Sequence, residues 1–180
     1  MAVAQLWNVR LTPMAIVRLT EQHKAAIRDK LTAEQACHLI YEVCDDTFYF
    51  GSVDDITGWI RDVLCVETFF GAMCDGGVTT WFDWCHARLA PFVPSALRAV
   101  GLPDFADHAD RALAVHVQPP YPNTVAEWDP TLERIRDSQL DEDFSAEYDA
   151  IETDFFALYH ADPSHFRTTL HAYVLKHLDD

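Results

Sequence analysis

Apolar residues recur at three- and four-residue steps along most of the chain, which is the spacing of one face of an α-helix. The most regular example is an apolar seam whose members follow at steps of four, three, four and three. The members of this seam are Phe144, Tyr148, Ile151, Phe155 and Leu158. No segment alternates apolar and polar residues for long enough to predict a β-strand. The pattern therefore predicts an all-α fold, a single compact bundle of about seven to nine helices.

Polar residues and glycines mark several of the expected helix ends. Thr32 is followed three residues later by Gln35, which predicts a capping box at the start of a helix. Gly76 and Gly77 follow a long apolar run and predict its end, because glycine readily adopts the left-handed backbone conformation. Residues 118–123 contain three prolines and predict an irregular connection between helices.

The length of 180 residues fits one domain. We expect residues 1–30 to form an N-terminal extension that packs on or flanks an all-helical acidic domain of residues 31–180. Arg10 and Pro13 interrupt the apolar residues near the N-terminus, so this end does not resemble a signal peptide. The longest uncharged stretch, residues 112–126, is too short to cross a bilayer. We therefore expect a cytoplasmic protein that does not enter a membrane.

Cysteine and histidine residues form no recognisable sequence motif. The five cysteines are odd in number and include no CxxC pair, so we interpret them as small core residues. The nine histidines show no HExxH or related zinc spacing, and no P-loop, GxGxxG or GxSxG sequence occurs. We therefore expect no cofactor, no metal ligand and no catalytic residue in a protein that is not an enzyme. The alternative is a small metal-binding or enzymatic site that uses the aspartates and histidines of residues 104–110 or 160–177.

Acidic residues set the electrostatic character of the chain. It contains 29 acidic residues against 13 lysines and arginines, which gives a formal net charge of −16. The first 40 residues hold five bases and three acids, so the whole excess of negative charge belongs to residues 41–180. A surface this negative repels nucleic acid and anionic membranes and attracts basic proteins. Direct binding to nucleic acid is therefore not expected.

The acids are most concentrated in residues 127–154, where eleven of them stand against two arginines. We take these eleven residues as the candidate partner-binding face: Glu127, Asp129, Glu133, Asp137, Asp141, Glu142, Asp143, Glu147, Asp149, Glu152 and Asp154. Asp129, Glu133 and Asp137 stand four residues apart and share one face of a helix, which Asp129 is expected to cap with Pro130 at the first helical position. Like charges at this spacing destabilise a helix by a few tenths of a kcal/mol per pair, so their retention needs a reason.

One reason is that the carboxylates imitate the phosphates of DNA. Duplex DNA carries one negative charge per about 1.7 Å of its axis. Carboxylates about 5–6 Å apart on neighbouring helices could approximate the phosphate spacing along a strand. Such a surface would occupy the basic groove of a DNA-binding protein, for example a helix-turn-helix transcriptional regulator. The alternative is a structural or oligomeric scaffold whose acidity serves only solubility.

Five segments of the chain share their pattern with a known family. They comprise the glycine turn with the aromatic residues after it, two central segments, and two aromatic C-terminal segments. These segments are residues 75–82, 96–101, 112–117, 154–159 and 170–174. On them the chain, over about residues 31–178, resembles a bacterial domain-of-unknown-function family that includes a DNA mimic protein. The resemblance implies an all-helical fold, suggests a homodimer, and implies from the characterised member an acidic surface that sequesters a transcriptional regulator by competing with DNA.

Overall fold

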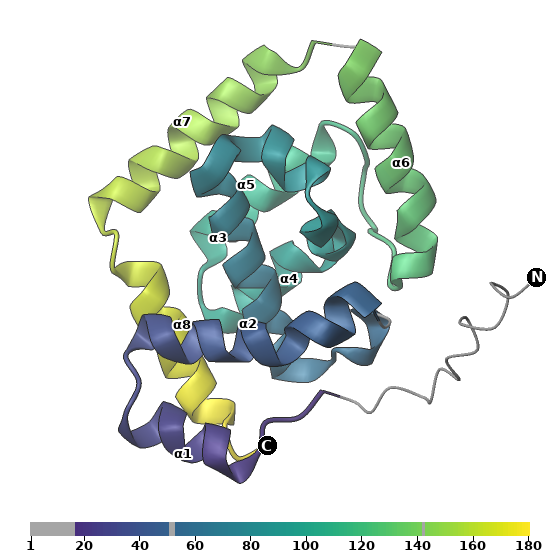
Figure 1. The fold of residues 1–180 in the computed structure, drawn as a ribbon. Helices are drawn as coiled ribbons and strands as arrows, with labels where there is room; N and C mark the ends of the chain where they lie inside the picture. Colours follow the sequence, from purple (N-terminus) through teal and green to yellow (C-terminus); the bar gives the residue numbers. More distant parts are fainter. Residues whose placement is uncertain (1–16, 51–52, 142) are drawn as a thin grey trace, which may run out of the picture.

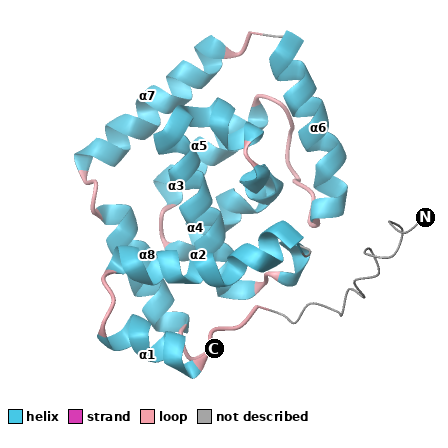
Figure 2. Ribbon diagram, in the orientation of Figure 1, coloured by secondary structure: helices cyan, strands magenta, loops and turns pink. Residues whose placement is uncertain are grey.

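The protein is helical throughout the part of the chain that the structure describes (Figure 1, Figure 2). The structure is a computed structural model, and it describes residues 17–50, 53–141 and 143–180. These ranges contain eight α-helices, two 3₁₀ segments and no strand, which confirms the predicted all-α fold. The elements are α1 (Glu21–Asp29), α2 (Ala33–Phe50), η1 (Val53–Asp55), α3 (Gly58–Asp83), η2 (Cys85–Phe92), α4 (Val93–Val100), α5 (Pro103–Ala114), α6 (Val125–Asp141), α7 (Ser145–Ala161) and α8 (His165–His177).

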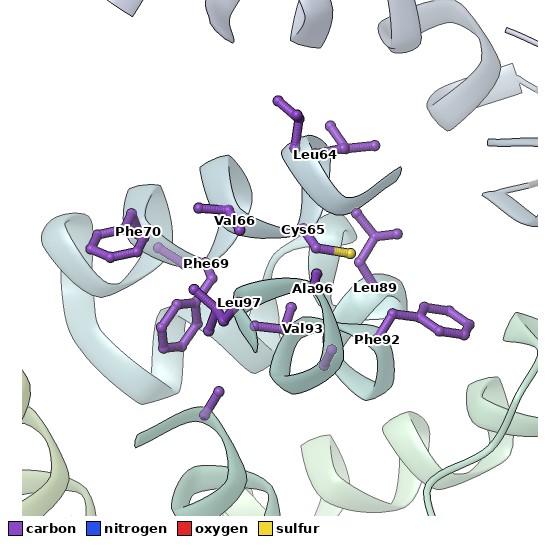
Figure 3. Packing of buried hydrophobic residues seen from close by; sticks show 14 of the residues in the cluster. Leu64, Cys65, Val66, Phe69, Phe70, Leu89, Phe92, Val93, Ala96 and Leu97 are labelled. Carbon is purple, nitrogen blue, oxygen red and sulfur yellow. The ribbon is translucent and has the colours of Figure 1, made fainter. Parts of the chain in front are cut away.

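The long helix α3 runs through the middle of the molecule and packs against η2 and five of the other α-helices, namely α2, α4, α6, α7 and α8 (Figure 1). Figure 3 shows its buried side chains, such as Phe69, facing those of α4, such as Leu97. The Phe70 ring stacks on Phe166 of α8 at a centroid distance of 4.0 Å. The same ring meets Phe105 of α5 edge to face at 4.8 Å. The aromatic side chains of α3 therefore hold helices from both halves of the chain in one core.

Two of the helix ends expected from the sequence can be compared with the structure. The capping box at the start of α2 is confirmed, because Gln35 N–H donates to Thr32 Oγ1 at 3.3 Å and Thr32 N–H donates to Gln35 Oε1 at 3.1 Å. Gly76 and Gly77 do leave the helical conformation, with Gly77 at φ 73°. They separate α3 into two helical stretches across a kink, and the second stretch continues to Asp83. The first stretch therefore ends at the glycines, as expected from the sequence.

The prediction that Asp129 caps a helix was wrong. Helix α6 begins four residues earlier, at Val125, where Thr124 Oγ1 accepts the N–H of Glu127 at 3.3 Å. Asp129 and Pro130 both lie inside α6. The Asp129 carboxylate accepts two hydrogen bonds from Arg88 of η2, at 3.1 and 2.9 Å, and these bonds direct it away from the helix backbone. The expected irregular connection before this helix is confirmed, since residues 118–123 form no helix.

Helices α6 and α7 lie along the outer edge of the molecule, and the end of α3 lies between them (Figure 1). They are joined where Gln139 Nε2 donates to the Tyr148 hydroxyl at 2.7 Å. At the other end of the molecule, α1 packs on α2 through Ile27, which is 1% exposed. The boundary expected at residue 30 stays a prediction, and residues 1–16 lie outside the described part. No helix in the described ranges is long and apolar enough to cross a membrane.

Candidate acidic interaction surface

Helix α6 turns its apolar side to the core and its acids to solvent. Trp128, Leu132 and Ile135 are buried at steps of four and three, and the Trp128 indole N–H donates to the carbonyl of Ala87 in η2 at 2.9 Å. The opposite side of the helix carries Glu133 and Asp137, both exposed. Because these residues are four apart, their Cβ atoms lie about 5–6 Å from each other. The expected carboxylate row is therefore present on α6, although without Asp129.

Helix α7 buries the apolar seam predicted from the sequence, with Tyr148, Ile151 and Phe155 all inside. The acids lie on the two flanks of that seam. Asp154 binds Arg111 of α5 at 2.8 Å, while Glu152 accepts the N–H of Val78 in α3 at 2.8 Å. The remaining acids of α7 and its start, Asp143, Glu147 and Asp149, are exposed.

The structure therefore sorts the eleven predicted residues into groups. Asp129, Glu152 and Asp154 bind other parts of the protein, and Glu127 accepts the Asn123 N–H at 3.2 Å at the start of α6. Glu142 and the side chain of Asp141 lie outside the described part of the chain. Five exposed carboxylates without an ion-pair partner in the described ranges remain, and we call them the acidic edge: Glu133, Asp137, Asp143, Glu147 and Asp149.

Two arginines, Arg134 and Arg136, lie beside this edge in the sequence, and neither forms an ion pair with it among the described residues. Arg134 is exposed, and Arg136 binds elsewhere. Arg136 donates to the carbonyl oxygens of Phe82, Asp83 and Trp84, at 2.9, 3.1 and 2.9 Å. These are carbonyls at the C-terminal end of α3, where the helix dipole is negative and a guanidinium is favourable. The positive charge of Arg136 therefore stabilises the C-terminal end of α3. This arrangement leaves the Asp137 carboxylate next to it in sequence to face solvent.

Glu152 fixes α7 to the bend in α3. Its carboxylate accepts the Val78 N–H, which is the first free amide after the two glycines. A Cβ atom on Gly77 would lie 2.0 Å from Glu152 Oε1, so a side chain there would displace the Glu152 carboxylate. The positive φ at position 77 and the close approach of the carboxylate thus both favour glycine. This contact sets where α7, and with it the acidic edge, stands against the core.

A second contact fixes the corner between α6 and α7. The Tyr148 hydroxyl lies 2.5 Å from His116 Nε2, and the Phe144 ring packs edge to face on the same imidazole at 4.7 Å. Burial, together with the nearby charges of Asp83 and Glu152, raises the pKa of Tyr148 to about 12, against a smaller lowering by the hydrogen bond from Gln139. Burial also lowers the pKa of His116, which favours its neutral form. The corner is therefore held by neutral groups, and the charges lie around it.

Sequence reasoning missed two residues of this region. Asp83, at the end of α3, is exposed and close enough to α7 for its charge to act on Tyr148. Leu140 follows Asp137 by three residues on α6 and is 85% exposed. Asp83 is 44 residues from the start of the acidic segment, so only the fold brings it near. Leu140 carried a weak signal, because it departs from the apolar spacing of Trp128, Leu132 and Ile135.

Two of the acids in residues 104–110, which belong to the alternative metal site, form ion pairs with one arginine. Arg98 binds both Asp107, at 2.8 Å, and Asp110, at 2.7 Å. The Tyr121 hydroxyl also donates to Asp110 at 3.0 Å, which anchors the proline-rich connection. Within the described ranges, no three His, Cys, Asp or Glu side chains converge so that they could hold a metal ion.

These features define an all-α protein with an exposed acidic edge on its two outer helices. The sequence profile of the DMP19-like protein family matches residues 54–177, a range that runs from η1 to the end of α8. The chain belongs to this family of DMP19-like proteins, and the resemblance to a family that includes a DNA mimic protein is confirmed. No curated protein and no solved structure was found to match the chain.

Proposed function

We propose that this protein is a non-enzymatic DNA mimic whose acidic edge binds a basic DNA-binding protein, such as a helix-turn-helix transcriptional regulator, and keeps it from its DNA. The observation that carries the proposal is that the five exposed carboxylates of the acidic edge form no ion pair among the described residues, while Arg136 binds the end of α3. Exposed charges of one sign on rigid helices attract a cationic surface and steer its approach. Membership of the DMP19-like family supports this function.

The geometry favours a competitor of DNA over a passive acidic coat. In a protein whose acidity serves only solubility, the positions of individual carboxylates would not matter. Here Glu152 and Tyr148 fix the two helices that carry the acidic edge to the core. Because these helices are already held against the core, binding a partner does not have to pay for ordering them. The proposal includes a location in the cytoplasm, where a transcriptional regulator acts, and assembly as a homodimer, which would present two acidic edges.

The test is displacement of DNA from a regulator. Each purified helix-turn-helix regulator of the host is bound to a fluorescently labelled duplex that carries its operator, and fluorescence anisotropy is followed as the protein is added. We expect at least one regulator to release its duplex, with an effect that weakens as salt is raised from 50 to 300 mM, because charge attraction is screened. If every regulator keeps its duplex at 50 mM salt, the proposal is wrong.

Two variants with the same net charge separate the effect of the acidic edge from the effect of the total charge. The edge variant carries Glu133→Gln, Asp137→Asn, Glu147→Gln and Asp149→Asn. The control variant removes four exposed acids from other surfaces by Glu21→Gln, Glu34→Gln, Glu42→Gln and Asp104→Asn. Both variants lose the same net charge, yet we expect only the edge variant to lose displacement. Equal loss in both would show that overall charge acts, and full activity of the edge variant would show that the edge is passive.

A further inference from the structure

Leu140 is an apolar side chain placed among carboxylates. It is 85% exposed, the most exposed large hydrophobic residue among those described. Asp137 lies one turn before it on the same side of α6, and the exposed Asp143 follows it at the start of α7. Hydrogen bonds from Ser145 lower the pKa of Asp143, so its carboxylate is charged. Along the chain, Leu140 thus lies between two exposed carboxylates, of which Asp137 shares its side of α6.

This position has no role in the fold. Leu140 contacts no part of the buried core, whereas Ile135, one and a half turns earlier, is 2% exposed. An isolated exposed leucine needs no special explanation, but one with a rim of charges has the composition of a protein contact site. Burying it against a partner would add an attraction that salt does not screen.

The major groove of DNA has the same combination of groups. Its two borders are rows of phosphates, and within it the C5-methyl group of thymine is the apolar feature that readers contact with apolar side chains. A protein that binds DNA only through its phosphates makes no use of this methyl group. A protein that reads bases places an apolar side chain between its phosphate-binding cations.

We propose that Leu140 occupies the place of a base-edge methyl group and is contacted by an apolar side chain on the base-reading surface of the partner. This inference rests on the proposed function and narrows it. The partner is then a sequence-specific DNA-binding protein with an apolar position between basic residues, and not any polycation. Charge complementarity to Asp137 and Asp143 brings that surface to the edge, and contact with Leu140 selects it.

The test compares Leu140→Ala with Leu175→Ala, which truncates the other exposed large hydrophobic residue, 43% exposed on α8. Affinity is measured for the regulator that the protein displaces from DNA and for a nona-arginine peptide, a cation without apolar side chains. We expect Leu140→Ala to weaken regulator binding about tenfold, equivalent to about 1.4 kcal/mol. Its affinity for nona-arginine and both affinities of Leu175→Ala stay unchanged.

The dependence of affinity on salt provides a second readout. Leu140→Ala should lower the affinity for the regulator equally at every salt concentration, while Asp137→Asn should reduce the slope of log affinity against log salt. Unchanged regulator binding by Leu140→Ala would overturn the inference and leave the proposed function standing. A shift of Leu140→Ala to a smaller assembly in sedimentation, without a change in regulator affinity, would overturn it in favour of contact with a second copy. If no regulator binds the wild-type protein at all, the proposed function itself fails.

Discussion

Acidic residues are bonded to other side chains at one end of the molecule and face solvent at the other. At the α8 end, Glu67 pairs with Arg167, and Asp62 accepts a hydrogen bond from the Tyr173 hydroxyl at 2.6 Å. At the α6–α7 end, Arg136 donates to backbone carbonyls and the neighbouring Asp137 faces solvent. The comparison shows that the number of acids does not decide where a surface is negative. That is decided by the atoms to which the few arginines donate.

The two ends also differ in what their charges do for stability. Burial raises the pKa of Glu67, and the Arg167 guanidinium opposes that rise by favouring the charged carboxylate. A carboxylate in such a position depends on its partner, because an unpaired charge away from water is costly. The carboxylates of the acidic edge keep their water and need no partner. The first end should therefore respond strongly to substitution, and the second should respond weakly.

The largest effect is expected from Arg167→Met. The substitution leaves Glu67 without its guanidinium and removes the contact of Arg167 with the Phe166 ring, 4.6 Å away. We expect the free energy of unfolding in urea to fall by about 3 kcal/mol. Arg28→Met is the control, because its ion pair with Asp179 at 2.7 Å is exposed and should contribute less than about 1 kcal/mol.

A second substitution sharpens this prediction. Glu67→Gln in the Arg167→Met background removes the unpaired charge, so most of the lost stability should return. If the double variant is no more stable than Arg167→Met, lost packing and not the buried charge causes the effect. Equal losses from Arg167→Met and Arg28→Met would break the proposed difference between buried and exposed pairs.

The same contrast explains which features could be predicted from the sequence. The seam of Tyr148, Ile151 and Phe155 and the capping box at Thr32 depend on neighbours a few residues away, so local spacing was sufficient. The role of Asp129 depends on Arg88, 41 residues earlier in the chain. No local pattern indicates such a pair, so the sequence predicted a helix cap in its place.

The acidic edge itself was only half predictable. Periodicity correctly placed Glu133 and Asp137 on an exposed face of α6, because apolar residues define the opposite face. It could not tell that Glu152 turns inward to the Val78 N–H, since this depends on a bend in α3 that lies 74 residues away. The net charge of a segment therefore overestimates the charge that it exposes to solvent. Some of its acids are bonded within the protein by contacts that only the fold creates.

The next largest effect is expected from Gly77→Ala, which disturbs Glu152, an acid of α7 that is bonded within the protein as the acids of the α8 end are. The new Cβ would meet Glu152 Oε1 at 2.0 Å and would also sit at a positive φ. We expect the free energy of unfolding to fall by about 2 kcal/mol or more. Gly58→Ala is the matched control, because Gly58 also has a positive φ, 62°, but has no atom within 4 Å of its would-be Cβ.

The difference between the two glycine variants contains two parts, the contact with Glu152 and the backbone of Gly77, whose φ of 73° with ψ of −155° is accessible almost only to glycine. Gly58→Ala should lose only about 1 kcal/mol. Glu152→Ala in the Gly77→Ala background removes the collision and should recover only the part of the loss that the contact causes. If both glycine variants lose the same stability, the Glu152 carboxylate moves aside freely and does not fix α7.

The smallest effect on stability is expected from substitutions in the acidic edge, which is the proposed binding site. Glu133→Gln and Asp137→Asn together remove a like-charge pair four residues apart on α6, so stability should rise by a few tenths of a kcal/mol in low salt. The gain should shrink in 0.5 M salt, where the repulsion is already screened. Asp154→Asn is the contrasting variant, because it breaks the ion pair with Arg111 and should lower stability slightly.

Thermal unfolding of the three proteins at both salt concentrations measures these signs. Replacing charges that oppose folding stabilises a protein, and it costs activity where those charges belong to the functional site. A stabilised Glu133→Gln/Asp137→Asn variant that no longer displaces DNA from a regulator would therefore link the acidic edge to binding. A destabilised variant would instead place these two carboxylates with Glu67, as acids that the fold itself needs.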